Sequence, residues 1–457
     1  MDYYAAIVRY INFPFGLFVK GQEKFYKHYQ VLERTQWASP QELRALQWSR
    51  LAILLRYAYA YSPYWRTAFE CLNIIPNDVT TIEHFQKLPI LTKKILQTEL
   101  NTILSRNIRQ EYLIENASGG STGEPTIFYQ DKERNYRRAM DQIRHDRWTG
   151  WKIGERSALL WGANYELKKY ESWIGRLNNA LFFRGIPLDA FNLTEQKMQS
   201  YLELLKRKMP TVIQAYAQAI ALFAQFIKEQ GLTVAPLKLK GIISSAEKLY
   251  PWQRAIIEEV FECKVFDRYG SREVGLIASE CNRFEGMHIN SDNVLVEFLR
   301  EDGTPCKLGE IGRIVVTDLW NKVTPFIRYD TGDLGKSLEQ LCSCGRGLPL
   351  MQCVEGRTSD FIRLSNGKII HGEYFTHLFY GIRGVKQFQL IQTAPRRLEL
   401  NVVKTETLDQ HIVERIVKKL HAFIDDSTVE VVVMYTDQIS PPLSGKRRFT
   451  ISKLSSP

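Results

Sequence analysis

Residues 118–125 read Ser-Gly-Gly-Ser-Thr-Gly-Glu-Pro, and the interpretation of the whole chain depends on this short stretch. Its glycines leave the backbone free to curl, so that N–H groups and hydroxyls can converge on phosphate oxygens. The contributing residues would be Ser118, Gly119, Gly120, Ser121, Thr122 and Gly123. No Gly-Lys-Ser/Thr follows, so this is not a Walker A loop. The sequence therefore predicts a phosphate-binding loop of another kind.

Two alternatives to phosphate binding remain open for this loop. It satisfies the Gly-x-Ser-x-Gly pattern of a serine hydrolase with Ser121 as nucleophile, and it could equally be a plain flexible turn. A nucleophile elbow runs directly into a helix, whereas residues 124–129 have the composition of a strand. Labelling by a fluorophosphonate probe would separate the hydrolase from the other two.

Outward from the loop, helix and strand patterns alternate for most of the chain. Ser39-Pro40-Gln41-Glu42 is typical of a helix start, and the helix should run to about Tyr61. Further helices are expected at Lys132–Trp148 and on both sides of Pro210. Strands are expected at Pro125–Tyr129, Gly241–Ser244, Lys264–Arg268, Asn293–Leu299 and Arg313–Leu319. This alternation predicts an α/β fold with several sheets and layered helices in a large domain, residues 1–355.

After Gly356 the pattern changes to that of a small α+β domain, residues 356–457. Val385–Gln392, Leu398–Val403 and Val429–Tyr435 should be strands, and Leu408–Phe423 an amphipathic helix. We expect this domain to be mobile relative to the large one.

Four further motifs contain residues that could bind a metal or a nucleotide, mark a domain boundary or take part in catalysis. Glu273, in Asp267-Arg268-Tyr269-Gly270-Ser271-Arg272-Glu273, could hold a Mg²⁺ ion that bridges phosphates, or could belong to a solvated Arg–Glu turn. Asp330 and Asp333 flank Thr-Gly and suit the hydroxyls of a ribose, although an Asx-turn connection would look the same. Gly356-Arg357-Thr358-Ser359-Asp360 marks the expected domain boundary. Lys446 ends a Pro- and Gly-rich loop that could place a cation on a developing negative charge, or it is part of a basic tail.

In this order, these motifs resemble those of the adenylate-forming superfamily of acyl-CoA synthetases, adenylation domains and luciferases. The resemblance is strongest to the phenylacetate–CoA ligase branch and its relatives associated with capsular polysaccharide and coenzyme F390 synthesis, and it extends over residues 85–450. It implies an enzyme that uses ATP and Mg²⁺ to convert a small carboxylic acid to an acyl-adenylate and passes the acyl group to CoA. An amine or hydroxyl of a surface polysaccharide is the alternative acceptor.

The resemblance also implies a role for each matching residue. Ser118–Gly123 would bind phosphates, Glu273 would bind Mg²⁺, and Lys446 would bridge the carboxylate and the α-phosphate. Asp333 would bind the ribose hydroxyls with support from Arg357, and Ser359-Asp360 would form the hinge of the small domain. The nucleotide and the acid pocket would be bordered by Ala246, Glu247, Asp267, Tyr269, Gly270 and Ser271.

Cysteine spacing indicates a possible structural zinc site. Cys281 and His288 are separated by six residues, and Cys342 and Cys344 form a tight Cys-x-Cys. Two such pairs supply the four ligands of a closed tetrahedral zinc site, with ordinary thiols as the alternative. Seven cysteines and no secretory signal favour reduced thiols and a cytoplasmic location.

The net charge of +11 does not by itself indicate nucleic-acid binding, because no nucleic-acid-binding signature accompanies the scattered basic residues. We expect a surface that attracts anionic substrates such as ATP. The apolar stretch Ala5–Val19 is too short and too interrupted to span a bilayer. We interpret it as a segment that docks on the large domain, with peripheral membrane contact as the alternative.

Overall fold

The computed structural model describes residues 2–19, 21–118, 126–161, 172–190, 193–352, 361–365, 369–371, 375, 378–379, 384–405, 410–424, 426–439 and 449–454. The chain divides into two compact units between residues 354 and 355, and residues 332–334 cluster with the second, smaller unit. Both units combine helices with sheets, in agreement with the α/β class expected from the sequence.

The large unit begins with helices. Ser39 caps α4 as expected, because its hydroxyl accepts from the Glu42 N–H while the Glu42 carboxylate accepts from the Ser39 N–H. The helical segments are α1 (Tyr3–Ile7), η1 (Val8–Asn12), α2 (Phe13–Val19), α3 (Glu23–Thr35), α4 (Pro40–Tyr61), α5 (Pro63–Cys71), η2 (Pro76–Asp78), α6 (Ile82–Gln86), α7 (Lys93–Thr98), α8 (Leu100–Ile103) and η3 (Gln110–Tyr112).

An eleven-stranded mixed sheet follows, in the order β10-β11-β12-β13-β9-β8-β7-β6-β5-β3-β4. The strands from β4 to β7 in this order are parallel, and β7, β8, β9, β13 and β12 pair antiparallel, as do β10 and β11. Their bounds are β3 (Ser157–Trp161), β4 (Gly185–Asp189), β5 (Val212–Tyr216), β6 (Gly241–Ser245), β7 (Val265–Ser271), β8 (Gly275–Glu280), β9 (Met287–Ile289), β10 (Val294–Leu299), β11 (Gly312–Asp318), β12 (Tyr329–Ser337) and β13 (Leu350–Gln352).

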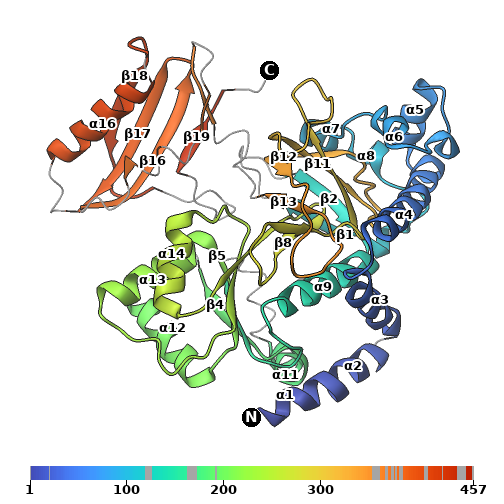
Figure 1. The fold of residues 1–457 in the computed structure, drawn as a ribbon, viewed down its shortest axis with the longest axis horizontal. Coiled ribbons are helices and arrows are strands. Elements are labelled where there is room, and N and C mark those ends of the chain that lie inside the picture. The colour runs from blue at the N-terminus through green and yellow to red at the C-terminus, as the bar shows by residue number, and fades with distance from the viewer. Residues whose placement is uncertain are drawn as a thin grey trace. The chain divides into compact units, whose positions relative to one another are not determined.

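Helices cover the parallel strands because these strands are apolar on both faces. Figure 1 shows α12 (Glu195–Lys208), α13 (Ala217–Glu229) and α14 (Pro251–Phe261) together beside β4 and β5. Side chains of these helices pack with those of the strands in one buried cluster. The remaining helical segments of this unit are α9 (Lys132–Arg147), α11 (Trp173–Asn178) and η4 (Asn179–Phe183).

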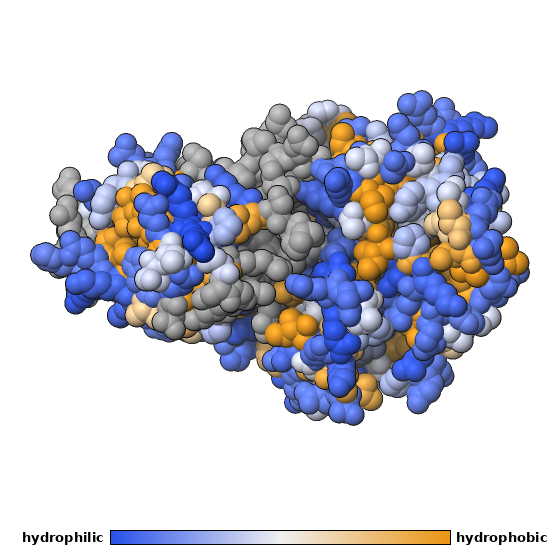
Figure 2. Space-filling model, turned by 90° about the horizontal axis from the view of Figure 1, so that it is seen from above, coloured by the Kyte–Doolittle hydropathy of each residue, from blue (hydrophilic) through white to orange (hydrophobic). Residues whose placement is uncertain are grey.

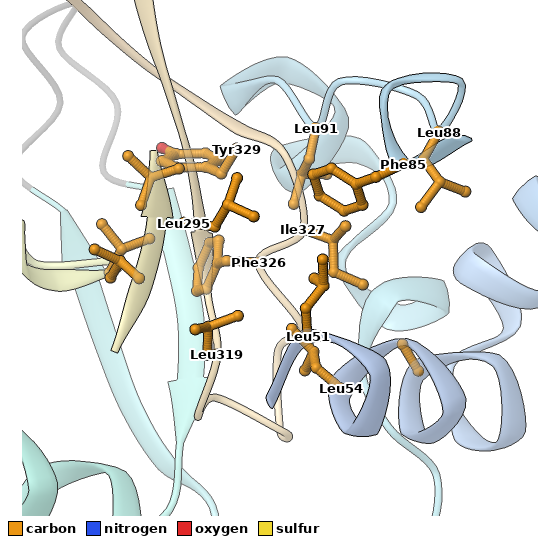
Figure 3. Close-up of a cluster of buried hydrophobic side chains, with 14 of the residues drawn as sticks. Leu51, Leu54, Phe85, Leu88, Leu91, Leu295, Leu319, Phe326, Ile327 and Tyr329 are labelled. Atoms are coloured by element: carbon orange, nitrogen blue, oxygen red, sulfur yellow. The ribbon is translucent and has the colours of Figure 1, made fainter. Parts of the chain in front are cut away.

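A second core fixes the N-terminal helices to the antiparallel strands. Leu51 and Leu54 of α4 point toward Phe326 and Ile327, and Phe85, Leu88 and Leu91 close the same cluster (Figure 3). The core anchors the segment that leads into β12, which carries the Asp-Thr-Gly-Asp motif.

The small unit is an α+β structure, as expected. Its four-stranded sheet has the order β18-β17-β16-β19 and packs against α16 (Gln410–Ile424) through one apolar cluster. The strands of the unit are β14 (Phe361–Arg363), β15 (Ile369–His371), β16 (Val385–Ala394), β17 (Arg397–Lys404), β18 (Glu430–Tyr435) and β19 (Thr450–Ser452).

Hydrophilic residues predominate on the face seen in Figure 2, and hydrophobic residues form small groups among them. Among the described segments, no helix combines the length and the apolarity that crossing a bilayer requires.

Candidate active site

The phosphate-loop sequence joins two paired strands. β1 (Ile114–Ser118) and β2 (Thr126–Gln130) are antiparallel, with Ser118 opposite Thr126. The strand after the loop is therefore confirmed, and it contradicts the serine-hydrolase alternative, because a nucleophile elbow requires a helix there. Gly119, Gly120, Ser121, Thr122 and Gly123 lie outside the described residues.

The carboxyl ends of three parallel strands bring several predicted residues to one edge of the sheet. Tyr216 at the end of β5 is opposite Ser245 at the end of β6, and Ser245 is opposite Arg268 in β7. Ala246 and Glu247 follow β6 directly, and Tyr269 follows Arg268. This is the edge at which parallel α/β sheets bind ligands.

The chain turns sharply where β6 ends. Ala246 has a φ of 70°, a left-handed conformation that costs a residue with a Cβ about 1–3 kcal/mol and is common at functional sites. Glu247 then accepts a 2.9 Å hydrogen bond from the backbone N–H of Gln218, in the first turn of α13. A carboxylate is favoured at this positive end of the helix. Glu247 thus joins the end of β6 to the start of α13 at this edge of the sheet.

The Tyr-Gly turn of β7 is held in place by its neighbours. Tyr269 donates to Thr331 Oγ1 at 3.2 Å, and Thr331 donates to the Ile314 carbonyl at 2.9 Å. A Cβ on Gly270 would lie 2.5 Å from the Gly275 carbonyl oxygen, so only glycine fits there. Ser271 Oγ accepts from the Val274 N–H at 3.3 Å and shapes the turn that carries Glu273.

Glu273 is 7% exposed, which rules out the solvated Arg–Glu turn considered from the sequence. Its Oε1 accepts a 3.2 Å hydrogen bond from the hydroxyl of Tyr329. A single hydrogen bond of this kind leaves further lone pairs of the carboxylate for a cation. A buried carboxylate at the ligand edge has the chemistry that Mg²⁺ prefers.

The backbone around Glu273 is bound to elements that follow the phosphate loop. Gln130 at the end of β2 donates to the Glu273 carbonyl at 3.4 Å. In α9, Arg134 donates to the Val274 carbonyl at 2.8 Å, and Arg138 donates to the Arg272 carbonyl at 3.0 Å. The strand and helix after the loop therefore position the turn of Glu273.

Arg134 also forms a fully buried ion pair with Asp318, at 2.6 Å. This pair and the Tyr329–Glu273 hydrogen bond were missed by reasoning from the sequence. Tyr329 directly precedes Asp330 in a motif identified from the sequence, so its position could have indicated that it lies near the site. Arg134 and Asp318 are 184 residues apart, and no local pattern connects them.

Asp330 and Asp333 lie on strand β12 rather than in an Asx-turn connection, which corrects that alternative. Asp330 pairs with Arg313 at 2.8 Å. Asp333 is buried and belongs to residues 332–334, which cluster with the small unit. Arg357, Ser359, Asp360 and Lys446 lie outside the described residues.

Asp267 is buried in the middle of β7. Burial and the nearby Glu280 carboxylate raise its pKa to about 8, although Arg254 opposes the shift. The Asp267 N–H donates to Glu280 Oε2 at 2.8 Å, and Arg254 pairs with the same carboxylate at 2.8 Å.

The folded protein should therefore hold a proton on Asp267 that the unfolded chain loses near pH 4. Because the folded state binds more protons between about pH 4 and pH 8, this residue should lower the free energy of unfolding as pH rises through that interval, by at most about 1.4 kcal/mol per pH unit. Denaturant unfolding at several pH values should show this slope reduced in Asp267→Asn. Asp302→Asn, at an exposed carboxylate, should leave it unchanged, and an unaltered slope in Asp267→Asn would contradict the shift.

The four predicted zinc ligands come together in the large unit. Cys281 follows β8, His288 is in β9, and Cys342 and Cys344 lie between β12 and β13. All four ligand atoms lie within 4.8 Å of one another. The Sγ atoms of Cys281 and Cys342 are 3.6 Å apart, and Cys344 Sγ is 3.4 Å from His288 Nε2.

These separations agree with tetrahedral coordination. Zn–S bonds of about 2.3 Å and Zn–N bonds of about 2.0–2.1 Å place ligand atoms about 3.5–3.8 Å apart. His288 Nδ1 lies 3.3 Å from the Leu348 carbonyl, so a proton on Nδ1 leaves Nε2 facing the sulfurs. The backbone N–H groups of Arg283 and Arg346 each donate to a cluster sulfur at 3.5 Å. The residues present thus fit a closed zinc site.

Comparison with known proteins shows which enzymes this chain resembles. Residues 362–453 match the CapK C-terminal domain family. A phenylacetate–coenzyme A ligase from Thermus thermophilus is 27% identical over 342 residues, covering 70% of this chain and 72% of the relative. The chain is therefore similar to phenylacetate–CoA ligases over most of its length. Protein CapK of Staphylococcus aureus is 22% identical and aligns over 95% of this chain and 96% of its own length.

The fold is also that of a solved CoA ligase structure. A 2-hydroxyisobutyryl-CoA ligase in the postadenylation state, in complex with R3-HIB-AMP, superposes with a TM-score of 0.71. The two sequences are 19% identical, and the match covers 92% of each chain. At this identity the likeness establishes the shared architecture of the adenylate-forming ligases.

Proposed function

We propose that this enzyme uses ATP and Mg²⁺ to convert a carboxylic acid to an acyl-adenylate and then transfers the acyl group to the thiol of CoA. The observation that carries the proposal is the buried Glu273 carboxylate. This carboxylate is buried in a turn whose backbone accepts hydrogen bonds from Gln130 and Arg134. Both of these residues belong to elements that follow the glycine–hydroxyl loop. The family relationship supports both half-reactions, because phenylacetate–CoA ligases are the relatives found.

In the first half-reaction a carboxylate oxygen of the acid attacks the α-phosphorus of ATP, and pyrophosphate leaves. The loop of residues 118–123 would bind the phosphates through backbone N–H groups and hydroxyls. Glu273 would hold Mg²⁺, which when bound offsets the negative charge of the phosphate oxygens. Tyr329 would keep the Glu273 carboxylate oriented. Lys446 would place a cation between the attacking carboxylate and the α-phosphate.

In the second half-reaction the sulfur of CoA attacks the carbonyl carbon of the adenylate, and AMP leaves. Asp333 and Arg357 would hold the ribose of the nucleotide. Ser359-Asp360 would act as the hinge about which the small domain, residues 356–457, changes its position between the two steps. Ala246, Tyr269 and their neighbours at the sheet edge would border the adenine and the acid.

ATP–pyrophosphate exchange with a panel of aryl, fatty, amino and hydroxy acids tests this proposal. One class of acid should support exchange, and Glu273→Gln should lower it about 10²–10³-fold by removing the metal-binding charge. Glu339→Gln, at an exposed carboxylate, makes the same chemical change and should leave exchange intact. A folded protein that binds ATP but exchanges with no acid in the panel would contradict the proposal.

A second acceptor is favoured by the match of residues 362–453 to the CapK C-terminal domain. In this version adenylation is the same, and an amine or hydroxyl of a surface polysaccharide attacks the adenylate in place of the thiol. Mass analysis of the products decides between them. Formation of a CoA thioester whenever CoA is supplied argues for the first acceptor and against the second.

We also propose that Cys281, His288, Cys342 and Cys344 bind a structural Zn²⁺ ion. Four protein ligands leave no open position for catalysis, so the ion would fix the segments between β8 and β9 and between β12 and β13. Both segments adjoin strands of the sheet that carry the candidate active site. Metal analysis of the purified protein tests this site directly.

A further inference from the structure

The N-terminal helical segment carries apolar side chains on two opposite sides, and the protein covers only one of them. α1, η1 and α2 form a continuous helical run over residues 3–19. Ala5, Val8, Phe13, Gly16 and Leu17 are buried against the large unit.

The opposite side of the same run carries a stripe of large apolar side chains that are 44–78% exposed: Tyr3, Ile7, Tyr10, Ile11, Phe15 and Phe18. Their spacing of three and four residues places them on one face of the helix. A shallow, mainly apolar hollow lies beside this stripe, and it is lined by Tyr10, Ile11, Pro14, Phe15, Phe18, Tyr26 and one acidic residue, Glu23. An apolar face this continuous marks an interaction site in a soluble protein.

A second helical segment extends the stripe sideways. Trp173, Ile174, Leu177 and Phe183 of α11 and η4 are 50–73% exposed. This segment lies beside the N-terminal run (Figure 1), because Asn12 donates to the Leu181 carbonyl at 2.9 Å and Tyr4 to the Ala180 carbonyl at 3.3 Å. Gly16 leaves room for the Phe182 ring, which a Cβ would touch. The two segments therefore form one aromatic surface, which we call the aromatic patch.

We propose that the aromatic patch docks on the surface of an anionic lipid bilayer. Tyr, Trp and Phe are the side chains that settle at the boundary between headgroups and acyl chains. The charge around the patch is mainly positive, which is complementary to anionic lipid. Arg9 is the only charged residue between Tyr3 and Val19. On the adjoining helices the exposed cations Arg176, Lys24 and Lys27 outnumber the exposed Glu23, and Lys24 also pairs with Glu133 at 2.7 Å. Cations beside an aromatic face add electrostatic attraction to the burial of apolar area.

A bilayer fits this surface better than a protein partner does. The helical run is about 25 Å long and is held along the body of the large unit, so it would lie in the plane of the interface rather than cross it. Lysine is depleted in protein–protein interfaces, whereas flanking lysines are typical of membrane-surface helices. The enzyme would then act at a membrane surface, which suits an acid or an acceptor that is itself lipid-borne.

Vesicle co-sedimentation of the full chain tests the patch. Wild-type protein should bind vesicles of phosphatidylcholine and phosphatidylglycerol at about 7:3 more tightly than phosphatidylcholine alone, and added salt should weaken the binding. Phe15→Ser with Phe18→Ser should lower the affinity by about tenfold or more, because two exposed rings no longer enter the interface. Leu308→Ser is the control: Leu308 is also a large apolar residue, 55% exposed, but it lies in the hairpin between β10 and β11.

Both phenylalanines are exposed, so the melting temperature should stay close to that of wild type and pyrophosphate exchange in solution should persist. Failure of wild type to bind either vesicle, or equal binding by the double variant, would overturn the proposal. If wild type is a dimer in solution and the double variant is a monomer, the patch contacts a second copy of the chain instead of a bilayer, and the proposal is overturned. None of these outcomes depends on whether the protein adenylates an acid.

Discussion

Replacing Lys446 with alanine is expected to lower the rate of acyl-adenylate formation by about 10²–10³-fold. The negative charge on the oxygens of the α-phosphate builds up as the carboxylate attacks, and a positioned cation stabilises the transition state more than the ground state. The measurement is pyrophosphate exchange with the acid that wild type accepts. The effect should appear in kcat more than in KM, because the interaction is strongest in the transition state.

Two controls separate chemistry from folding in this experiment. Lys418→Ala removes the same charge from an exposed position on α16 of the same unit and should leave exchange unchanged. Lys446→Ala should also still convert a supplied acyl-adenylate to the thioester, because no phosphorus centre reacts in that step. If the variant loses both half-reactions equally while remaining folded, Lys446 does not have the role proposed here.

Loss of one zinc ligand is the second change with a large expected effect. Cys344→Ser should reduce the bound metal from one zinc ion per chain to well below that, and should lower the melting temperature by about 5–10 °C. The reason is that metal binding contributes free energy only to the folded state, in which the four ligands are assembled. Cys344 is partly exposed, so the substitution itself leaves no large cavity.

A chelator supplies an independent measurement of the same site. It should lower the melting temperature of wild type by a similar amount and should have little further effect on Cys344→Ser. Cys306→Ser changes a thiol that lies outside the cluster, and its metal content and chelator response should match those of wild type. Purified wild type without zinc, together with a chelator-insensitive melting temperature, would argue that the four residues are ordinary thiols.

Much of the secondary structure could be predicted from the sequence because its signals are local. The capping box at Ser39 and Glu42 begins α4, and the expected helix at Lys132–Trp148 is observed as Lys132–Arg147. The strands expected at Asn293–Leu299 and Arg313–Leu319 are observed as an antiparallel pair. Each of these signals lies within a few residues of the element that it specifies.

The candidate site was predictable only in part. Glu273 and the Cys/His set were identified because carboxylates and paired cysteines stand out against their surroundings. The proton of Asp267 was not predictable, since it depends on burial and on the Glu280 carboxylate, which comes from another strand. The domain boundary at residues 355–356 and the mobility of the small domain remain predictions.

The sequence by itself determined which segments are helices or strands and which residues could carry chemistry. Tertiary structure alone decided which of these residues meet: Cys281 with Cys342, 61 residues apart, and Tyr329 with Glu273, 56 apart. It also decided which face of residues 3–19 is covered, because large apolar side chains occur on both the covered and the exposed side and so give no signal of orientation. Contacts between distant segments depend on how sheets and helices pack, and that packing leaves no local mark in the chain.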